Sequence, residues 1–435
     1  MNRVIDQLVY PITNKFEVEM NLPGSKSITL RNLILASLAD GRSEIKMPGI
    51  CDDTYRMKDS LQRLGIRIEE VDTQIWNVYG NNGEFIDDDV ELDIGMSGTS
   101  TRFLIAYSIL RQATTTLDGH ESLRARPNKY LTDALQSIGV SISASRDGYL
   151  PVSIKGSSVY PKNITLRGDK SSQYFSAMMQ IASALPQGLI IEVEGELVSK
   201  PYIDITINEM NKFGLVVENN NYEKFSVSNQ TYQGIQLTVE GDASAASYFS
   251  SLATLHGGKV IIKNLGTSTK QGDFNFFKVC ELLGARVTYA ENETIIQGSI
   301  DGRLNPLNEI DMEMMPDVAL TLIVIAPLIP GRTRITGLST LRIKECDRIS
   351  CPVRELRKIG VSIEEGDDYV VVDEYPLPVT TKVTDIETYD DHRMAMSFAI
   401  LATKLGNLNI LDAECVNKTY PYFWEDLKRF YYKEV

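Results

Sequence analysis

The sequence is short of the features that mark several common protein classes. It has 3 histidines and 5 cysteines in 435 residues, and neither type recurs at the spacing of a metal site. The odd number of cysteines fits reduced thiols in a cytosol better than a disulfide framework. The most apolar segment, Val318–Ile329, is far shorter than a membrane span. These absences argue against a zinc module, a disulfide scaffold and a transmembrane protein.

Positive charge is scarce as well. There are 44 lysines and arginines against 58 aspartates and glutamates, which gives a formal net charge of −14. A surface of this sign repels nucleic acid and anionic membranes, so we expect neither as a partner. The first residues, Met1–Gln7, lack the apolar run of a signal peptide, and we expect a cytoplasmic protein. The length predicts two or three domains.

One pattern recurs along the chain. A helix-like segment ends in a glycine and continues directly into alternating β-type residues, at spacings of 70 to 76 residues. These glycines suit the left-handed turn that ends a helix. They are Gly65, Gly139, Gly214, Gly284 and Gly360. A sixth copy falls near Phe430 and lacks its glycine. The repeat predicts an α/β chain of six βαβ-containing modules.

The segment Asn21–Arg31 contains the first candidate for chemistry. A strand-like run, Phe16–Leu22, is halted by Pro23 and Gly24, and a helical pattern then begins. Ser25, Lys26 and Ser27 are therefore expected at a helix N-terminus, where free N–H groups and the helix dipole favour an anion. Arg31, one turn on, adds charge. The alternative is a serine-capped helix with surface cations.

Other helices are expected to begin in the same way. Their starts are rich in glycine and serine and lie at Met96–Thr101, Lys170–Gln173 and Gly241–Ala245. If the modules are related by pseudo-symmetry, these N-termini point the same way, and two groups of them line a cleft with the positive ends of helix dipoles. Six tandem scaffold modules that bind a partner protein are the alternative.

Cations are concentrated in a few stretches despite the acidic total. These stretches are Arg124–Pro127, Leu341–Arg348 and Asp390–Met396. Each alone could be a solvated charge run, and Lys344 with Arg348 could be a salt-bridged helix face. Together they suit a polyanion, because attraction decays over roughly 8 Å at physiological salt and must be local.

Carboxylates stand among these cations, where a simple anion trap would exclude them. They are Asp317, Glu345, Asp390 and Asp391. Proton transfer is a positive reason to keep an acid there, because one carboxylate can act as general base while another acts as acid. Asp317 could equally be a helix N-cap after Pro316. His392, beside the last pair, is read as a packed, hydrogen-bonded histidine.

With these motifs in order along the whole chain, the sequence resembles the enolpyruvylshikimate-phosphate (EPSP) synthases. The resemblance rests on Leu22–Ser27 with Arg31, Gly98-Thr99 with Arg102, Arg126-Pro127, Ser171–Gln173, Val198–Ile205, Glu240–Tyr248, Pro316-Asp317, Arg342–Arg348, Asp391–Met396 and Lys418–Pro421. It implies two similar domains, each of three βαβαββ-type units, with a cleft between them. The expected domains are residues 1–24 with 242–435, and residues 25–241.

The resemblance also implies an activity and a set of site residues. The activity is transfer of the enolpyruvyl group of phosphoenolpyruvate to a hydroxyl of shikimate phosphate, in the shikimate pathway of aromatic amino acid biosynthesis, by a monomer without metal or organic cofactor. Asp317, Glu345 and Lys26 are implied in catalysis. Shikimate phosphate is implied to bind Lys26, Ser27, Arg31, Ser171, Ser172, Gln173, Ser199, Tyr202, Asp317, Thr340 and Lys344. Phosphoenolpyruvate is implied to bind Lys26, Gly98, Arg126, Gln173, Arg348, Arg393 and Lys418.

Three positions depart from the residues usual in that family. They are Met96, Phe103 and Thr340, and Phe103 is expected to change the packing behind Gly98. An alternative within the same chemistry is a cell-wall enolpyruvyl transferase acting on a UDP-amino sugar. That family usually carries a cysteine in the loop before its Arg-Pro, and Gly119–Ala125 has none. The other alternative is a non-catalytic repeat scaffold or anion-binding protein.

Overall fold

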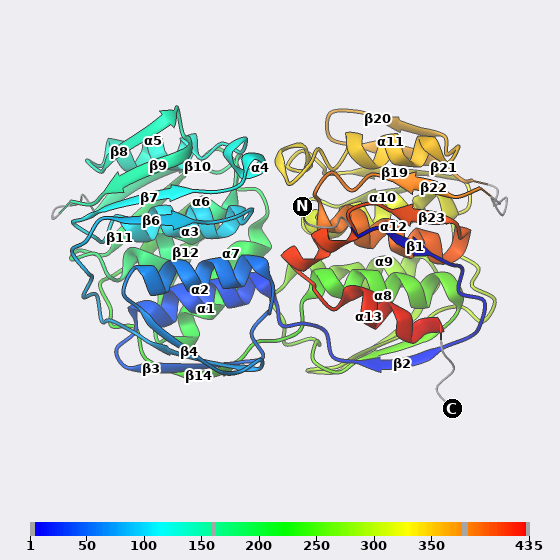
Figure 1. Cartoon of the computed structure of the whole chain (residues 1–435), viewed down its shortest axis with the longest axis horizontal. Coiled ribbons are helices and arrows are strands. Elements are labelled where there is room, and N and C mark those ends of the chain that lie inside the picture. The colour runs from blue at the N-terminus through cyan, green and yellow to red at the C-terminus, as the bar shows by residue number, and fades with distance from the viewer. Residues whose placement is uncertain (1–4, 158–159, 161, 376–381, 432–435) are drawn as a thin grey trace. The chain divides into compact units, whose positions relative to one another are not determined.

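The chain forms two compact units. The structure, a computed structural model, describes residues 5–157, 160, 162–375 and 382–431. One unit consists of Gly24–Val239, and the other combines Met1–Pro23 with Glu240–Val435 (Figure 1). We call these the middle unit and the terminal unit. Each has its own cluster of buried apolar side chains.

Six small sheets follow the repeat that the sequence predicts. Each sheet belongs to one module, and in five modules the order of elements is strand, helix, strand, helix and a two-stranded hairpin. The first two strands pair in parallel, and the hairpin adds to the second strand in the order first, second, fourth, third. A parallel pair with a helical crossover brings the start of the first helix and the end of the second strand to one edge of the sheet. The predicted α/β class is confirmed.

The middle unit contains three such modules. The first consists of β14 (Gln236–Thr238), α1 (Lys26–Leu38), β3 (Arg42–Lys46), α2 (Asp52–Arg63), β4 (Arg67–Asp72) and β5 (Ile75–Tyr79). The second consists of β6 (Val90–Asp93), α3 (Gly98–Ser108), β7 (Thr114–Asp118), α4 (Glu121–Arg124), α5 (Lys129–Ser137), β8 (Ser141–Arg146) and β9 (Tyr149–Lys155). The third consists of β10 (Asn163–Arg167), α6 (Ser172–Ala182), β11 (Leu189–Glu194), α7 (Lys200–Lys212), β12 (Val217–Asn220) and β13 (Lys224–Val227).

The terminal unit contains the other three. The fourth module consists of β2 (Glu17–Met20), α8 (Ala243–His256), β15 (Lys259–Ile262), η1 (Gly272–Asn275), α9 (Phe276–Leu282), β16 (Arg286–Tyr289) and β17 (Thr294–Gln297). The fifth consists of β18 (Glu309–Asp311), α10 (Pro316–Ile325), η2 (Ala326–Leu328), β19 (Arg332–Thr336), η3 (Leu341–Ile343), α11 (Ser350–Lys358), β20 (Ile363–Glu365) and β21 (Val370–Asp373). The sixth consists of β22 (Thr384–Ile386), α12 (His392–Leu405), β23 (Leu408–Ile410), η4 (Ala413–Lys418), α13 (Phe423–Lys428) and η5 (Arg429–Tyr431), with β1 (Gln7–Val9).

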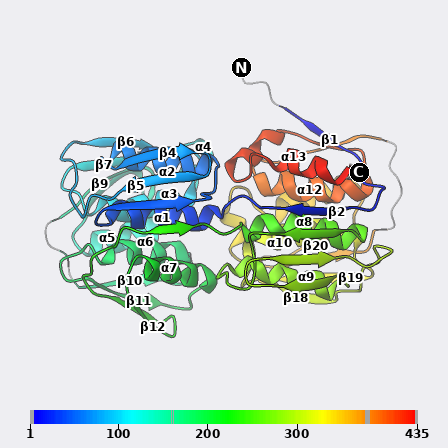
Figure 2. The same cartoon turned by 90° about the horizontal axis from the view of Figure 1, so that it is seen from below.

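The first helix of each module is the more deeply buried one. In α1, α3, α6, α8, α10 and α12 nearly every residue is buried, whereas the second helices keep an exposed face. Within each unit the three first helices contact one another, and Figure 2 shows α1, α3 and α6 side by side. The sequences of such helices are largely apolar all round, because protein covers both of their faces. They form the core on which the site is placed.

Two first strands are exchanged where the chain enters and leaves the middle unit: each belongs to the sheet of one unit but is followed in sequence by a helix of the other. β2 precedes α1 in sequence but pairs in parallel with β15 of the terminal unit, where α8 follows in the module. β14 precedes α8 in sequence but pairs in parallel with β3 of the middle unit. Asn264 joins the two crossings, because its side chain bonds the N–H and the C=O of Leu22, and its backbone oxygen accepts from Gly241.

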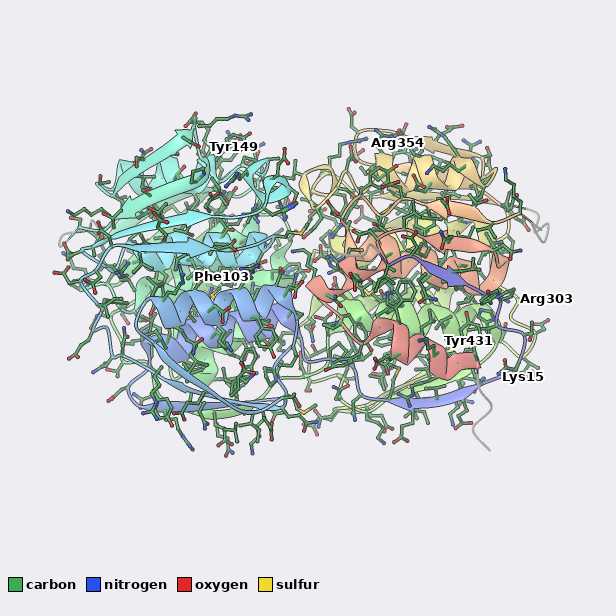
Figure 3. All side chains as sticks on the ribbon, in the orientation of Figure 1. Lys15, Phe103, Tyr149, Arg303, Arg354 and Tyr431 are labelled. Carbon is green, nitrogen blue, oxygen red and sulfur yellow. The ribbon has the colours of Figure 1, made fainter. Side chains whose placement is uncertain are left out.

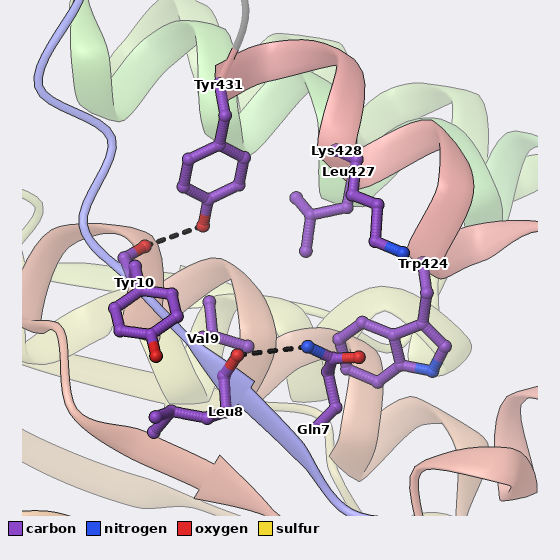
Figure 4. A pocket seen from close by; sticks show the side chains of 8 residues that line it. All are labelled: Gln7, Leu8, Val9, Tyr10, Trp424, Leu427, Lys428 and Tyr431. Carbon is purple, nitrogen blue, oxygen red and sulfur yellow. Dashed lines mark hydrogen bonds between the residues drawn. The ribbon is translucent and has the colours of Figure 1, made fainter.

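The sixth sheet departs from the others because none of the described residues adds a hairpin to it. β1 instead pairs antiparallel with β23, in the place that a fourth strand holds elsewhere. A cavity of about 320 Å³ lies beside β1, against α13. Figure 4 shows the residues that line it, Gln7, Leu8, Val9, Tyr10, Trp424, Leu427, Lys428 and Tyr431.

The helix-ending glycines adopt the conformation that the repeat predicts. Their φ angles are +94° at Gly65, +92° at Gly139, +82° at Gly214, +103° at Gly284 and +92° at Gly360. A side chain at such a φ is strained, and glycine is not. Among the described residues, no helix combines the length and the apolar character needed to span a membrane.

Candidate active site

Most of the predicted site residues lie at two kinds of place, in the modules other than the fourth. They lie at the N-terminus of the first helix, or between the second strand and the start of the second helix. Both places lie at the carboxyl ends of the parallel strands, the edge at which open α/β sheets bind ligands. In the middle unit the helix starts carry Lys26, Ser27, Gly98 and Ser171–Gln173, and the connections carry Arg126, Ser199 and Tyr202.

Lys26 is held by a carboxylate of the neighbouring helix. It is the first residue of α1, after the N-cap Ser25, as the sequence predicts. Its Nζ lies 3.2 Å from Oδ2 of Asp53, in the first turn of α2. Both side chains are largely covered, with exposures of 15% and 4%. The pair fixes the ammonium at the helix N-terminus, where an anion would meet it.

Arg31 is bonded mainly to the protein itself. Nε donates to Thr206, Nη1 to the backbone oxygen of Ser27, and Nη2 to Ser176 and the backbone oxygen of Tyr202, at 2.8 to 3.3 Å. Burial lowers the pKa of Arg31 to about 10. Its guanidinium lies over the buried ring of Phe103, labelled in Figure 3, at 5.3 Å from the centroid. Arg31 therefore ties α1 to α6 and α7.

Gly98 and Arg126 are brought into contact, as two residues assigned to one ligand should be. A Cβ on Gly98 would lie 2.9 Å from Nη1 of Arg126, so glycine makes room for the guanidinium. Arg102, one turn along α3, donates to Oε1 of Gln173 at 2.6 Å. Arg102 was part of the motif but was not among the predicted ligands. These contacts connect the starts of α3 and α6.

The serines at the remaining helix starts are arranged to accept or donate locally. Ser171 is the N-cap of α6, and its hydroxyl accepts from the N–H of Gln173 at 3.2 Å. Ser199, the N-cap of α7, has a φ of 54°. A non-glycine residue in this left-handed region costs free energy and is concentrated at functional sites. Strain at Ser199 is consistent with its predicted role.

Asp317 lies among three cations. Its Oδ1 is 3.1 Å from Nζ of Lys344 and 3.5 Å from Nη1 of Arg348, and its Oδ2 is 3.2 Å from Nη2 of Arg393. The carboxylate keeps 20% of its surface exposed. Met315 is the N-cap of α10, so the reading of Asp317 as an N-cap is wrong. It lies in the first turn, where its charge suits the helix dipole.

Glu345 lies between Arg348 and one further cation, Lys418. Its Oε2 is 2.8 Å from Nη2 of Arg348, and its Oε1 is 3.7 Å from Nζ of Lys418. Arg348, 2% exposed, also makes a forked pair with Asp391 at 2.7 and 3.1 Å. Lys344–Arg348 is not helical, because η3 ends at Ile343 and α11 begins at Ser350. The reading of this stretch as a salt-bridged helix face is therefore wrong.

The cations of the terminal unit outnumber its carboxylates at this place. Lys344, Arg348, Arg393 and Lys418 face Asp317, Glu345 and Asp391. Burial lowers the pKa of Lys344, although the charge of Asp317 opposes the shift. The cluster therefore combines four cations with three carboxylates at one place.

Some cationic positions lie apart from the site, and some site residues were missed. Arg124 pairs with the exposed Asp118. Thr340 is half-buried just before η3. Asp53 and Asp391 were not assigned a role, because nothing in the sequence showed which cations they face. His392 is 1% exposed and lies 3.6 Å from Asp391, which fits the reading of a packed histidine.

The comparisons with known proteins agree along nearly the whole chain. The family model described as EPSP synthase (3-phosphoshikimate 1-carboxyvinyltransferase) matches residues 11–427. A 3-phosphoshikimate 1-carboxyvinyltransferase of Sulfurovum sp. is 38% identical over 95% of this chain and 96% of its own. One of Photobacterium damsela is 38% identical over 98% and 99%. The fold matches an EPSP synthase of Acinetobacter baumannii, with a TM-score of 0.78, 23% identity and 97% of each chain covered. It also matches the enolpyruvyl transferase NikO of Streptomyces tendae, with a TM-score of 0.78, 15% identity and 98% of each chain covered.

Proposed function

The chain belongs to the EPSP synthase family, and we propose that it transfers the enolpyruvyl group of phosphoenolpyruvate to a hydroxyl of shikimate phosphate and releases phosphate. The observation that carries the proposal is Asp317, a partly open carboxylate held by Lys344, Arg348 and Arg393. An anion-binding scaffold has no use for a carboxylate there. A transferase that must remove a proton beside two anionic substrates does.

Phosphoenolpyruvate needs donors for a carboxylate and a phosphate. Arginine suits both, because its planar fork bonds two oxygens at once. We assign this role to Arg126, Arg348 and Arg393, with Lys26, Lys418 and Gln173. The contact of Arg126 with Gly98 supports the assignment, because it leaves an anion access to the guanidinium and to the start of α3.

Shikimate phosphate carries a phosphate and several hydroxyls. Ser171 and Ser172 stand at the N-terminus of α6, a place suited to phosphate. Lys26, Ser27, Arg31 and Gln173, with Ser199, Tyr202, Thr340 and Lys344, complete the assignment. We also assign Asp317 to this ligand, as the group that faces the reacting hydroxyl.

The chemistry divides between two carboxyl groups. The hydroxyl oxygen attacks the carbon that bears the phosphate, Asp317 takes its proton, and a proton is added to the methylene carbon. The tetrahedral intermediate then loses phosphate and one methyl proton to restore the double bond. Glu345, between Arg348 and Lys418, is the second proton-transfer group, and Lys26 stabilises charge on the substrates.

An acceptor comparison tests the proposal. Phosphate release from phosphoenolpyruvate is measured with shikimate 3-phosphate or with UDP-N-acetylglucosamine. Release with the first acceptor alone is expected. Release with the nucleotide sugar would favour the cell-wall reaction, and binding of both anions without release would favour the non-catalytic alternative.

The same proposal extends to the protein as a whole. We propose a cytoplasmic monomer, because the acidic surface gives no sign of a nucleic acid or membrane partner. We also propose that the two units are domains bounded near residues 24 and 241. Light scattering at working concentration tests the monomer, and limited proteolysis tests the domain boundaries.

A further inference from the structure

One module lacks, at one place, what every other module has there: a residue assigned to a ligand or, for Asp53, one that pairs with an assigned residue. Between the second strand and the start of the second helix, the other five modules place Asp53, Arg126, Ser199 with Tyr202, Lys344–Arg348, and Lys418. In the fourth module this connection contains η1, whose carboxylate residue is Asp273, buried to 5% exposure. The topology therefore brings Asp273 to the same sheet edge as the site residues of its unit.

Contacts join Asp273 to the site. Ser244, in the first turn of α8, donates its hydroxyl hydrogen to Oδ2 of Asp273. The same hydroxyl oxygen accepts from Nη2 of Arg393 at 3.2 Å, and that nitrogen also lies 3.2 Å from Oδ2 of Asp317. The chain of bonds runs from Asp273 through Ser244 and Arg393 to Asp317.

The connection is fixed firmly enough to hold a side chain in place. Gln271, 7% exposed, accepts from the N–H of Ala243 at 3.0 Å. Its Nε2 donates to the oxygen of Gly241 and to Glu240, both at 2.8 Å. These bonds fasten the segment before η1 to the start of α8. Asp273 and Ser244 therefore move as one body.

The charged groups around Asp273 come from three helices. Asp317 belongs to α10, Arg393 to α12, and Asp242 caps α8. On α9, which follows η1, Lys278 and Glu281 are exposed. Burial and the charge of Asp317 raise the pKa of Asp273 from 3.8 to about 7, although Arg393 opposes the shift.

We propose that Asp273 is a positioning residue of this active site, which through Ser244 holds Arg393 against Asp317. The inference rests on the proposed function. Above neutral pH Asp273 ionises, and its charge opposes an anionic substrate at Arg393. Affinity for phosphoenolpyruvate should then fall.

The test is the pH dependence of the KM for phosphoenolpyruvate in native protein, Asp273→Asn and Ser244→Ala. Asparagine keeps an oxygen for Ser244 but cannot ionise. Between pH 6 and 8.5 the ratio of the native KM for phosphoenolpyruvate to that of Asp273→Asn should rise about tenfold. This is the effect expected of one added negative charge a few ångströms from the ligand's partner, Arg393. Ser244→Ala should raise the KM for phosphoenolpyruvate more than that for shikimate phosphate, because it releases Arg393.

A matched control and a second readout keep the test decisive. Glu355→Gln alters another buried carboxyl of the same unit, bonded to Tyr389 and Lys358, and should leave the KM profile unchanged. The melting temperature of Asp273→Asn relative to native protein should rise with pH through 7, with or without activity. A KM ratio and a melting difference that both stay flat with pH would overturn the proposal. A native protein without transferase activity would instead refute the proposed function.

Discussion

Asp317 and Glu345 have similar chemistry but different surroundings. Asp317 is partly open and meets three cations, whereas Glu345 is 9% exposed and lies between Arg348 and Lys418. Asp317→Asn and Glu345→Gln should each lower kcat by about two to four orders of magnitude, the usual contribution of a positioned acid or base. KM should change less, because charge and shape near the substrates are largely kept.

Asp347 supplies the matched control for that measurement. It lies in the same motif, but its carboxylate caps α11 by accepting from Ile349 and Ser350 and pairs with Arg342. Asp347→Asn should reduce stability and leave kcat near the native value. A near-native kcat for either active-site amide variant would remove that residue from the mechanism.

Arg348 should discriminate between the two substrates. Its Nε and Nη2 form the fork with Asp391, and its Nη1 faces Asp317. A lysine cannot reproduce this geometry. Arg348→Lys should therefore weaken the binding of phosphoenolpyruvate, measured by calorimetry, much more than the binding of shikimate phosphate. Equal losses for both ligands would show that the assignment of Arg348 is wrong.

His256 should make the protein sensitive to acid. It is half-buried, and desolvation lowers its pKa from 6.5 to about 3. A histidine with a lowered folded-state pKa contributes stability above its unfolded pKa and loses it as the pH falls below that value. Between pH 6.5 and 5 the loss is about 2 kcal/mol. His256→Gln should show a smaller drop in unfolding free energy over this range, measured in urea, and an equal drop would contradict the prediction.

Single residues show where sequence reasoning reached its limit. Glu345 stands in a stretch dense with cations, so its chemistry was visible in the sequence, whereas Asp317 has no lysine or arginine between Arg303 and Arg332 and was reached through the Pro316-Asp317 motif of the resemblance. Asp53 and Asp273 act on partners 27 and 120 positions away, and their local sequence offered only a helix start or a turn. Partners at such a distance are set by the packing of modules, which residue types do not show.

At the scale of elements, the helix-ending glycines are the best-predicted feature, because their cause is local. Gly139 has a φ of +92°, and no atom lies within 4 Å of the position that a Cβ would take there. Gly139→Ala should therefore cost roughly 1 kcal/mol through backbone strain alone, without a change in kcat. Gly139→Asn should recover part of the loss, because asparagine tolerates this region better. Unchanged stability of the alanine variant would contradict this reading.

Strand partners were less predictable than strands and helices. The sequence places a strand before Pro23, and β2 is there, but its pairing with β15 joins residues more than 200 positions apart. The three-residue strand β1, which completes the last sheet, carries no periodic signal of its own. Pairing of this kind depends on the whole fold.

At the scale of the whole molecule, the two crossings carry glycines for a reason of packing. A Cβ on Gly24 would lie 2.0 Å from the backbone oxygen of Met47, and one on Gly241 would lie 2.8 Å from Oδ1 of Asn264. Close approach of neighbouring atoms explains them directly.

The most direct measurement follows the fate of the enolpyruvyl carbon. Phosphoenolpyruvate labelled with carbon-13 at its second carbon is incubated with shikimate 3-phosphate and the protein, and the products are observed by NMR. The predicted result is a new resonance from an enol ether carbon that is bonded to the shikimate oxygen, with one phosphate released for each molecule of enol ether formed. Labelled pyruvate with phosphate, or no turnover at all, would contradict carboxyvinyl transfer.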